Sequence, residues 1–245
     1  LADLDRKGEN MSLHISSAFN EDLTHINAKV NEMGGLCERM LEASIKAIKK
    51  SDVNIADQII ILDEKINTLE IEVNEAVIKA IALRQPVADD LRVLISAIKI
   101  SGAFERIGDL CKNIAKRTRL VLDDLPKKTR DKIANLGEKV LEQLTKSINS
   151  YTKQDLQLAK IVWEKDYEID EMYTALFDVL LKYLKKKKRI AAGSHLVIIA
   201  KNFERIGDHT THISRMIHFA ITGETLDLER PKFNLPSSLG ENNET

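Results

Sequence analysis

Apolar residues recur along this chain in alternating steps of four and three, the spacing of one face of an α-helix. The first run is Phe19, Leu23, Ile26, Val30, Met33, Cys37 and Met40. Its narrow stripe is typical of a coiled-coil-like seam. A second run covers about residues 53–83 and stops at Arg84-Gln85-Pro86, because proline removes a backbone donor and disfavours helix at the residue before it. A third begins near Asp89 or Asp90 and extends to about Leu122.

The middle of the chain, residues 120–128, interrupts the pattern, and Pro126 marks the expected domain boundary. Beyond it the spacing predicts helices over about residues 129–152, 155–184 and 194–222. The predicted fold class is all-α: two homologous three-helix bundles in tandem, six long helices over residues 12–124 and 127–222. Residues 1–11 are expected to form a disordered start, since Met11-Ser12 would make a native beginning. Residues 223–245 are expected to form a mobile tail.

The two halves also share sequence. Phe104 to Asp109, which reads FERIGD, recurs unchanged 99 residues later at 203–208. Farther upstream, an offset of 103 pairs Asp63 with Asp166, Asn67 with Asp170, Gly34 with Gly137, Leu41 with Leu144 and Ile45 with Ile148. The change of offset predicts a shorter turn between the second and third helices of the second repeat. Six helices are therefore interpreted as one three-helix unit used twice.

Composition excludes several function classes. The 37 Lys+Arg against 38 Asp+Glu leave a formal charge of −1, so no bulk attraction to nucleic acid or anionic membranes is expected. The longest apolar runs are far shorter than the roughly 20 residues that cross a bilayer. No stretch near the N-terminus has the pattern of a secretory signal. The two cysteines, Cys37 and Cys111, lie on apolar stripes and are expected to be buried thiols in a reducing, cytosolic compartment.

Carboxylates repeated along the edge of the apolar stripe form the candidate site. The candidate metal ligands are Asp63, Asn67, Glu105 and Asp109 in the first repeat, and Asp166, Asp170, Glu204, Asp208 and His212 in the second. Carboxylates at the edge of a core need cations. These cations could be metal ions or the side chains of an Arg or Lys ion-pair network. Oxygen ligands favour Mg, Mn or Fe, and a histidine would admit Zn or Fe.

The doubled FERIGD, with RQPVADDLR at Arg84–Arg92 ahead of the first copy, resembles the PhoU family of phosphate-transport accessory proteins over about residues 12–222. The resemblance implies paired three-helix bundles, usually dimeric, with metal ions or clusters on Glu/Asp-x-x-x-Asp motifs. It also implies a non-enzymatic cytosolic regulator that represses phosphate-starvation genes. The implied partners are a PhoR-type sensor kinase and the ATPase of a Pst-type phosphate ABC transporter, so any membrane association would be peripheral.

The acidic motifs of that family fall on the candidate residues, with two departures. Asn67 stands where the second repeat has Asp170, and His212 stands where the first repeat has Asn113. The first metal site is therefore expected to be the weaker of the two. The line Arg92, Lys99 and Arg106 is expected to face solvent and to offer a contact surface for partners.

Two alternative functions remain open at this point. A carboxylate-bridged metal enzyme in a helical bundle would typically use Glu-x-x-His pairs, and the sequence contains none. A passive coiled-coil scaffold would not need acids aligned with its core stripe. The sequence also lacks a Walker loop, so nucleotide hydrolysis is not expected.

Overall fold

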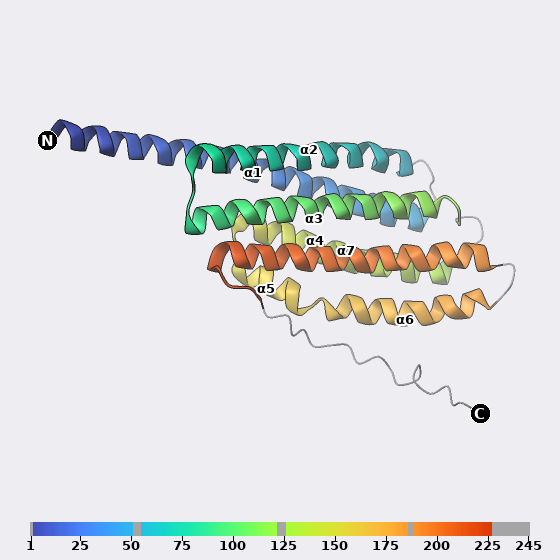
Figure 1. The fold of residues 1–245 in the computed structure, drawn as a ribbon. Helices are drawn as coiled ribbons and strands as arrows, with labels where there is room; N and C mark the ends of the chain where they lie inside the picture. Colours follow the sequence, from blue (N-terminus) through green and yellow to red (C-terminus); the bar gives the residue numbers. More distant parts are fainter. Residues whose placement is uncertain (1, 51–54, 122–125, 186–188, 227–245) are drawn as a thin grey trace, which may run out of the picture.

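The computed structural model describes residues 2–50, 55–121, 126–185 and 189–226, which form seven helices and no strand (Figure 1). The helices are α1 (Ala2–Lys50), α2 (Ile55–Arg84), α3 (Ala88–Thr118), α4 (Lys127–Lys153), α5 (Leu156–Glu164), α6 (Tyr167–Leu184) and α7 (Ile190–Thr222). The all-α prediction is thus confirmed. No described helix has the length and apolar character needed to cross a membrane.

The predicted single helix over residues 155–184 is wrong, because the chain breaks between α5 and α6. Asp155 caps α5 by accepting a hydrogen bond from the backbone nitrogen of Leu158 at 3.0 Å. At the break, the side-chain amide of Gln143 in α4 donates to the carbonyl oxygen of Lys165 at 2.9 Å. The same carbonyl also accepts from the backbone nitrogen of Glu168 at 3.1 Å, so a local and a tertiary bond together satisfy it, and neither glycine nor proline is needed there.

The expected disordered start at residues 1–11 is also wrong from Ala2 onward, since α1 already begins there. Residues 2–11 contain good helix formers and no proline, so the helix that packs from Phe19 onward extends toward the N-terminus. At the other end, α7 stops at Thr222, and Gly223 takes a left-handed conformation with φ of 80°. Most of the expected mobile tail, residues 227–245, lies outside the described residues.

The two repeats lie side by side and share one core. Helices α1, α2 and α3 pack together, as do α4, α5, α6 and α7, and the repeats join through α1 against α4 and α3 against α7 (Figure 1). Buried apolar side chains from both repeats form one continuous cluster. The tandem bundles are therefore fused along their length and do not simply meet at Pro126.

Helices α3 and α7 run antiparallel, which relates the repeats by an approximate two-fold axis. Near the start of α3, the Arg92 Nε donates to the carbonyl oxygen of Ala220 at 3.3 Å, close to the end of α7. Near the end of α3, the Arg117 Nη1 lies 3.2 Å from the His195 Nδ1, close to the start of α7. The expectation that Arg92 faces solvent is therefore wrong, since packing of the two repeats covers it, whereas Lys99 and Arg106 are exposed.

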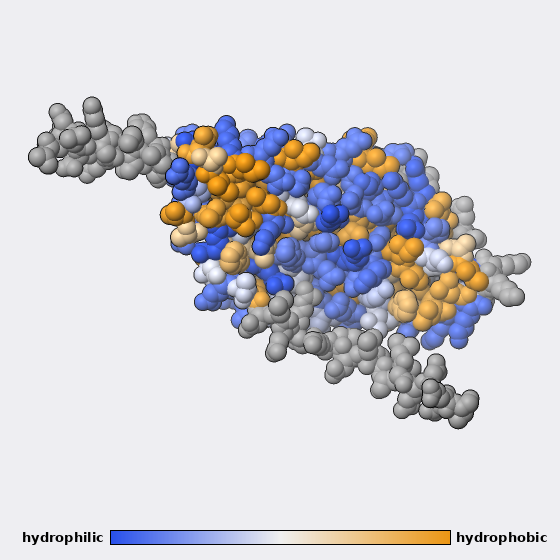
Figure 2. Space-filling model, in the orientation of Figure 1, coloured by the Kyte–Doolittle hydropathy of each residue, from blue (hydrophilic) through white to orange (hydrophobic). Residues whose placement is uncertain are grey.

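Exposed apolar side chains gather at opposite ends of the molecule, as Figure 2 shows. The first-repeat patch, where α2 ends and α3 begins, consists of Ile78, Leu83, Val87 and Leu91; the second-repeat patch, where α6 ends and α7 begins, consists of Leu181 and Ile190. Ile78 corresponds to Leu181 at an offset of 103, and Leu91 corresponds to Ile190 at an offset of 99. The two patches therefore lie at equivalent ends of the two repeats and share two corresponding positions, whereas Lys186 stands at the position of Leu83.

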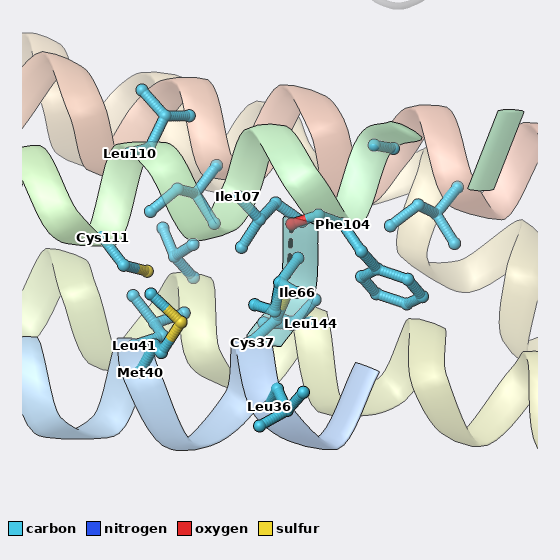
Figure 3. Packing of buried hydrophobic residues seen from close by; sticks show 14 of the residues in the cluster. Leu36, Cys37, Met40, Leu41, Ile66, Phe104, Ile107, Leu110, Cys111 and Leu144 are labelled. Carbon is cyan, nitrogen blue, oxygen red and sulfur yellow. Dashed lines mark hydrogen bonds between the residues drawn. The ribbon is translucent and has the colours of Figure 1, made fainter. Parts of the chain in front are cut away.

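The core between α1, α2, α3 and α4 contains both cysteines (Figure 3). The Cys37 thiol donates to the carbonyl oxygen of Phe104 at 3.2 Å. Burial raises the pKa of Cys37 and of Cys111 well above the usual range of a thiol. Both thiols are thus buried and protonated, which confirms the prediction that they serve packing.

Candidate functional site

The glycine of each FERIGD motif brings an acidic helix against the motif helix. A Cβ atom on Gly108 would lie 3.1 Å from the Ile66 Cδ1 and 3.5 Å from the Asp63 Oδ1. In the second repeat, a Cβ on Gly207 would lie 2.9 Å from the Ile169 Cδ1 and 3.8 Å from the Asp166 Oδ1. The absence of a side chain at these glycines therefore places Asp63 and Asp166 in the helix contact, where both are buried.

In the first repeat, a lysine bridges two of the expected carboxylates. The Lys112 Nζ on α3 donates to the Asp63 Oδ2 at 2.5 Å and to the Asp109 Oδ1 at 2.6 Å. Burial by itself lowers the pKa of Lys112, but the hydrogen bonds to Asp109 and Asp63 outweigh it and raise the pKa above its usual value. The first-repeat carboxylates thus form the ion-pair network that was one of the two interpretations of the sequence.

Glu105 lies near these two acids on α3; its side chain is 25% exposed, and the Arg106 Nε lies 3.4 Å from its Oε2. Burial raises its pKa; Arg106 opposes this shift, and Asp109, Glu70 and Asp63 add to it. Glu70, two turns after Asp63 on α2, is therefore a further carboxylate of this site that sequence analysis missed. Asn67 is exposed.

The second repeat has a different centre, because Thr211 stands at the position of Lys112. The Thr211 hydroxyl donates to the Asp166 Oδ1 at 2.8 Å. On the same helix, the Glu204 Oε1 accepts a hydrogen bond from the Lys201 Nζ at 2.6 Å. The Glu204 Oε2 is buried and has no hydrogen-bond partner among the described residues.

The charge around Glu204 is unfavourable for a carboxylate. Burial raises the pKa of Glu204; the hydrogen bond from Lys201 lowers it, and Asp208 and Asp166 raise it further. Tyr173 on α6 also faces this group, and the Lys201 Nζ lies 5.4 Å from the centre of its ring. A buried carboxylate oxygen beside two further acids is a group that a cation would stabilise.

The remaining candidate ligands do not complete a metal-binding group with these acids within the described ranges. Asp170 lies half-buried on α6, and His212 lines a cleft between α3 and α7 together with Asp208, Lys99 and Arg106. Within the described ranges, no three His, Cys, Asp or Glu side chains form a group arranged to hold a metal ion. The structure thus contains no preformed metal centre in those ranges, and metal binding stays a prediction.

The family model for the PhoU domain matches the chain twice, at residues 30–118 and 133–217. This chain belongs to the PhoU family. Each match covers most of one repeat, so the PhoU domain corresponds to the unit that the doubled FERIGD motif indicated.

Individual PhoU proteins are similar over most of the chain. A phosphate-specific transport system accessory protein PhoU homolog from Caulobacter vibrioides is 42% identical over 93% of this chain and 100% of its own length. One from Rhizobium meliloti is 40% identical over 93% of this chain and 97% of its own. The crystal structure of PhoU from Pseudomonas aeruginosa superposes with a TM-score of 0.81 at 26% identity, covering 84% of this chain and 100% of the other.

Proposed function

We propose that this PhoU-family chain is a non-enzymatic, cytosolic regulator that represses the phosphate-starvation response when phosphate is plentiful. The main support for this proposal is the doubled PhoU domain, together with relatives named as accessory proteins of a phosphate-specific transport system. In this proposal it works as a homodimer with two partners, the ATPase of a Pst-type phosphate transporter and a PhoR-type sensor kinase.

The two equivalent apolar patches support an adaptor role. Ile78 in the first-repeat patch is 63% exposed and its counterpart Leu181 is 42% exposed. Exposed apolar groups that gather in one place mark interaction surfaces more often than single exposed residues do. A molecule with one such patch at each end has equivalent surfaces with which to contact two partners, or two copies of one partner.

We also propose that the second repeat binds a divalent or trivalent metal ion such as Fe, Zn, Mn or Mg. Asp166 and Glu204 would supply oxygen ligands, with Asp170 and Asp208 beside them, and the buried Glu204 Oε2 supports this assignment. The ion would neutralise these acids and hold α6 against α7. In the first repeat, Lys112 already supplies positive charge, so a metal on Asp63, Glu105 and Asp109 would bind more weakly.

The regulatory proposal is tested in a bacterium that carries this gene, by deleting it and measuring alkaline phosphatase during growth at high phosphate. The expected result is high activity in the deletion strain and repression on complementation with the wild-type gene. Low activity in the deletion strain at high phosphate would overturn the proposal and favour the carboxylate-enzyme alternative.

Patch variants test the adaptor role in the same strain. Ile78→Ser with Leu181→Ser should fail to restore repression, because both equivalent surfaces lose their apolar character. Ile61→Ser is the matched control, since Ile61 is 67% exposed on α2 outside either patch. Full repression by the double variant would exclude the patches as partner surfaces.

A further inference from the structure

An open cleft lies between α3 and α7, the two helices that carry FERIGD. Its volume is about 540 Å³, and its lining residues are Lys99, Gly102, Ala103 and Arg106 from α3 and Asp208, His209 and His212 from α7. A Cβ atom on Gly102 would meet no other atom within 4 Å, so the α3 wall is open at this point.

Two basic side chains line this cleft. Lys99 and Arg106 line it from α3, and both are exposed. The contact of Arg106 with Glu105, at 3.4 Å, involves an arginine side chain that is 65% exposed, so it is weak and easily exchanged. Arg205 and Arg215 on α7 add their fields to those of the two α3 cations.

Two histidines of α7 also line the cleft, close to these basic groups. Burial lowers the pKa of His209 to about 4, and His212, Arg205 and Arg106 contribute to the lowering. Burial also lowers the pKa of His212, with Arg215 and Lys99 adding to the effect. Each imidazole carries a ring N–H that can donate to an oxyanion in the cleft.

A field of this sign favours an anion over a metal cation. Lys99, Arg106, Arg205 and Arg215 would repel a divalent metal, whereas an oxyanion would gain charge-assisted hydrogen bonds from the cations that line the cleft. Of the described residues that line the cleft, Asp208 is the one with a carboxylate. A carboxylate among cations can accept a hydrogen bond from an anion that still carries a proton.

Comparison with the other repeat shows that the fold does not require this chemistry. At an offset of 99, Lys99 corresponds to Ile198, Gly102 to Lys201, His209 to Leu110 and His212 to Asn113. Lys201 is engaged with Glu204. The equivalent positions therefore lack the lysine and the two histidines of the cleft, although Arg205 and Asp109 stand at the positions of Arg106 and Asp208.

We propose that this cleft binds a phosphoryl anion, either free phosphate or the phosphoryl group of a larger molecule. Lys99 and Arg106 balance its charge, His209 and His212 donate to its oxygens, and Asp208 accepts the proton of hydrogen phosphate. Sulfate has no such proton at neutral pH, so the carboxylate discriminates between the two ions. The choice of phosphate among oxyanions rests on the proposed function. The preference for an anion rests on the charge of the cleft and is independent of that function.

Calorimetric titration of the full, metal-free chain in chloride buffer tests this, with inorganic phosphate, glycerol 3-phosphate and sulfate as separate probes. Inorganic phosphate should bind in the millimolar range or tighter, and sulfate should bind more weakly. Tighter binding of glycerol 3-phosphate than of inorganic phosphate would assign the site to a phosphorylated molecule and still support the proposal. Equal binding of sulfate, or no binding of either phosphorylated probe, would overturn it.

Three variants locate the binding. Lys99→Gln with Arg106→Gln should weaken phosphate binding roughly tenfold or more, because two charged donors are lost. Lys79→Gln with Lys116→Gln is the matched control, since it removes the same charge from two exposed lysines outside the cleft. Asp208→Asn should weaken phosphate but not sulfate.

Unchanged phosphate affinity in the Lys99 and Arg106 double variant would overturn the site, provided that thermal melts show a folded protein. The alkaline phosphatase assay separates this proposal from the regulatory one. A chain that binds phosphate in the cleft but does not repress alkaline phosphatase would overturn only the proposed regulation.

Discussion

Gly34 of α1 lies against Ile148 of α4, and the counterparts of these two residues make the same contact in reverse. A Cβ atom on Gly34 would lie 3.2 Å from the Ile148 Cγ1, and a Cβ on Gly137 would lie 2.8 Å from the Ile45 Cγ1. Both pairs are related by the offset of 103. The interface between the repeats is thus built like that of a symmetric dimer, in which one patch contacts its own copy.

Gly137→Ala should destabilise the chain by about 1–2 kcal/mol, because the new methyl group would overpack a filled core. Its Cβ would also lie 2.9 Å from ring atoms of Phe203. Gly34→Ala should cost less, since its nearest contacts are longer. Urea unfolding measures both. Gly102→Ala is the control and should stabilise by up to about 1 kcal/mol, because it gains helix propensity in open space. Equal stability of the Gly137 and Gly102 variants would contradict the close interface.

Lys112→Met should destabilise the chain by about 2–4 kcal/mol, because Asp63 keeps a buried charge without its ammonium partner. The side chains of Lys112 and Asp63 are 21% and 4% exposed. Adding Asp63→Asn should recover much of the loss, since it removes that charge. Denaturant unfolding of the two single variants and the double variant gives the coupling energy. Strictly additive losses would show that the ion pair does not couple α2 to α3.

Stability should fall as the pH drops from 6.5 toward 4, because His209 binds its proton more weakly in the folded chain. Its pKa is about 4 when folded and 6.5 in the unfolded reference, so the unfolded state takes up more protons in this window. Because His209 is partly exposed and solvent screens its charge, the loss from this group is on the order of 1–2 kcal/mol near pH 4.

His209→Leu, which places the residue of Leu110 at the equivalent position, should make the dependence of stability on pH shallower in that window. Melts in phosphate-free buffers at several pH values measure the difference between wild type and variant. Parallel pH profiles would rule out His209 as the cause.

Exchanging the residues at positions 112 and 211 should move the preferred metal site between repeats. Thr211→Lys places an ammonium group beside Asp166 and should abolish metal binding in the second repeat. Lys112→Thr removes the competing charge beside Asp63 and should raise the affinity of the first. Metal content after dialysis against manganese or zinc measures both. Unchanged metal content in the Thr211 variant would show that the second repeat does not hold the metal ion.

The sequence by itself determined most of the helices, the repeat and the family. Steps of four and three residues specify one buried face for each helix, because a helix must cover that face to fold. The doubled FERIGD marked the positions where acids approach the core, and the structure buries Asp63 and Asp166 there. Those inferences rest on local periodicity and on identity between halves, and both can be observed in a linear chain.

Tertiary structure alone decided which cation each acid meets and which helix each side chain faces. Lys112 is one turn from Asp109 in the sequence, but only the docking of α2 on α3 brings Asp63 to the same ammonium group. The break between α5 and α6 has no local signal, because Gln143 of another helix helps to satisfy it. His212 faces Lys99 of α3 because the two repeats pack antiparallel, a relation between distant segments that helical periodicity does not contain.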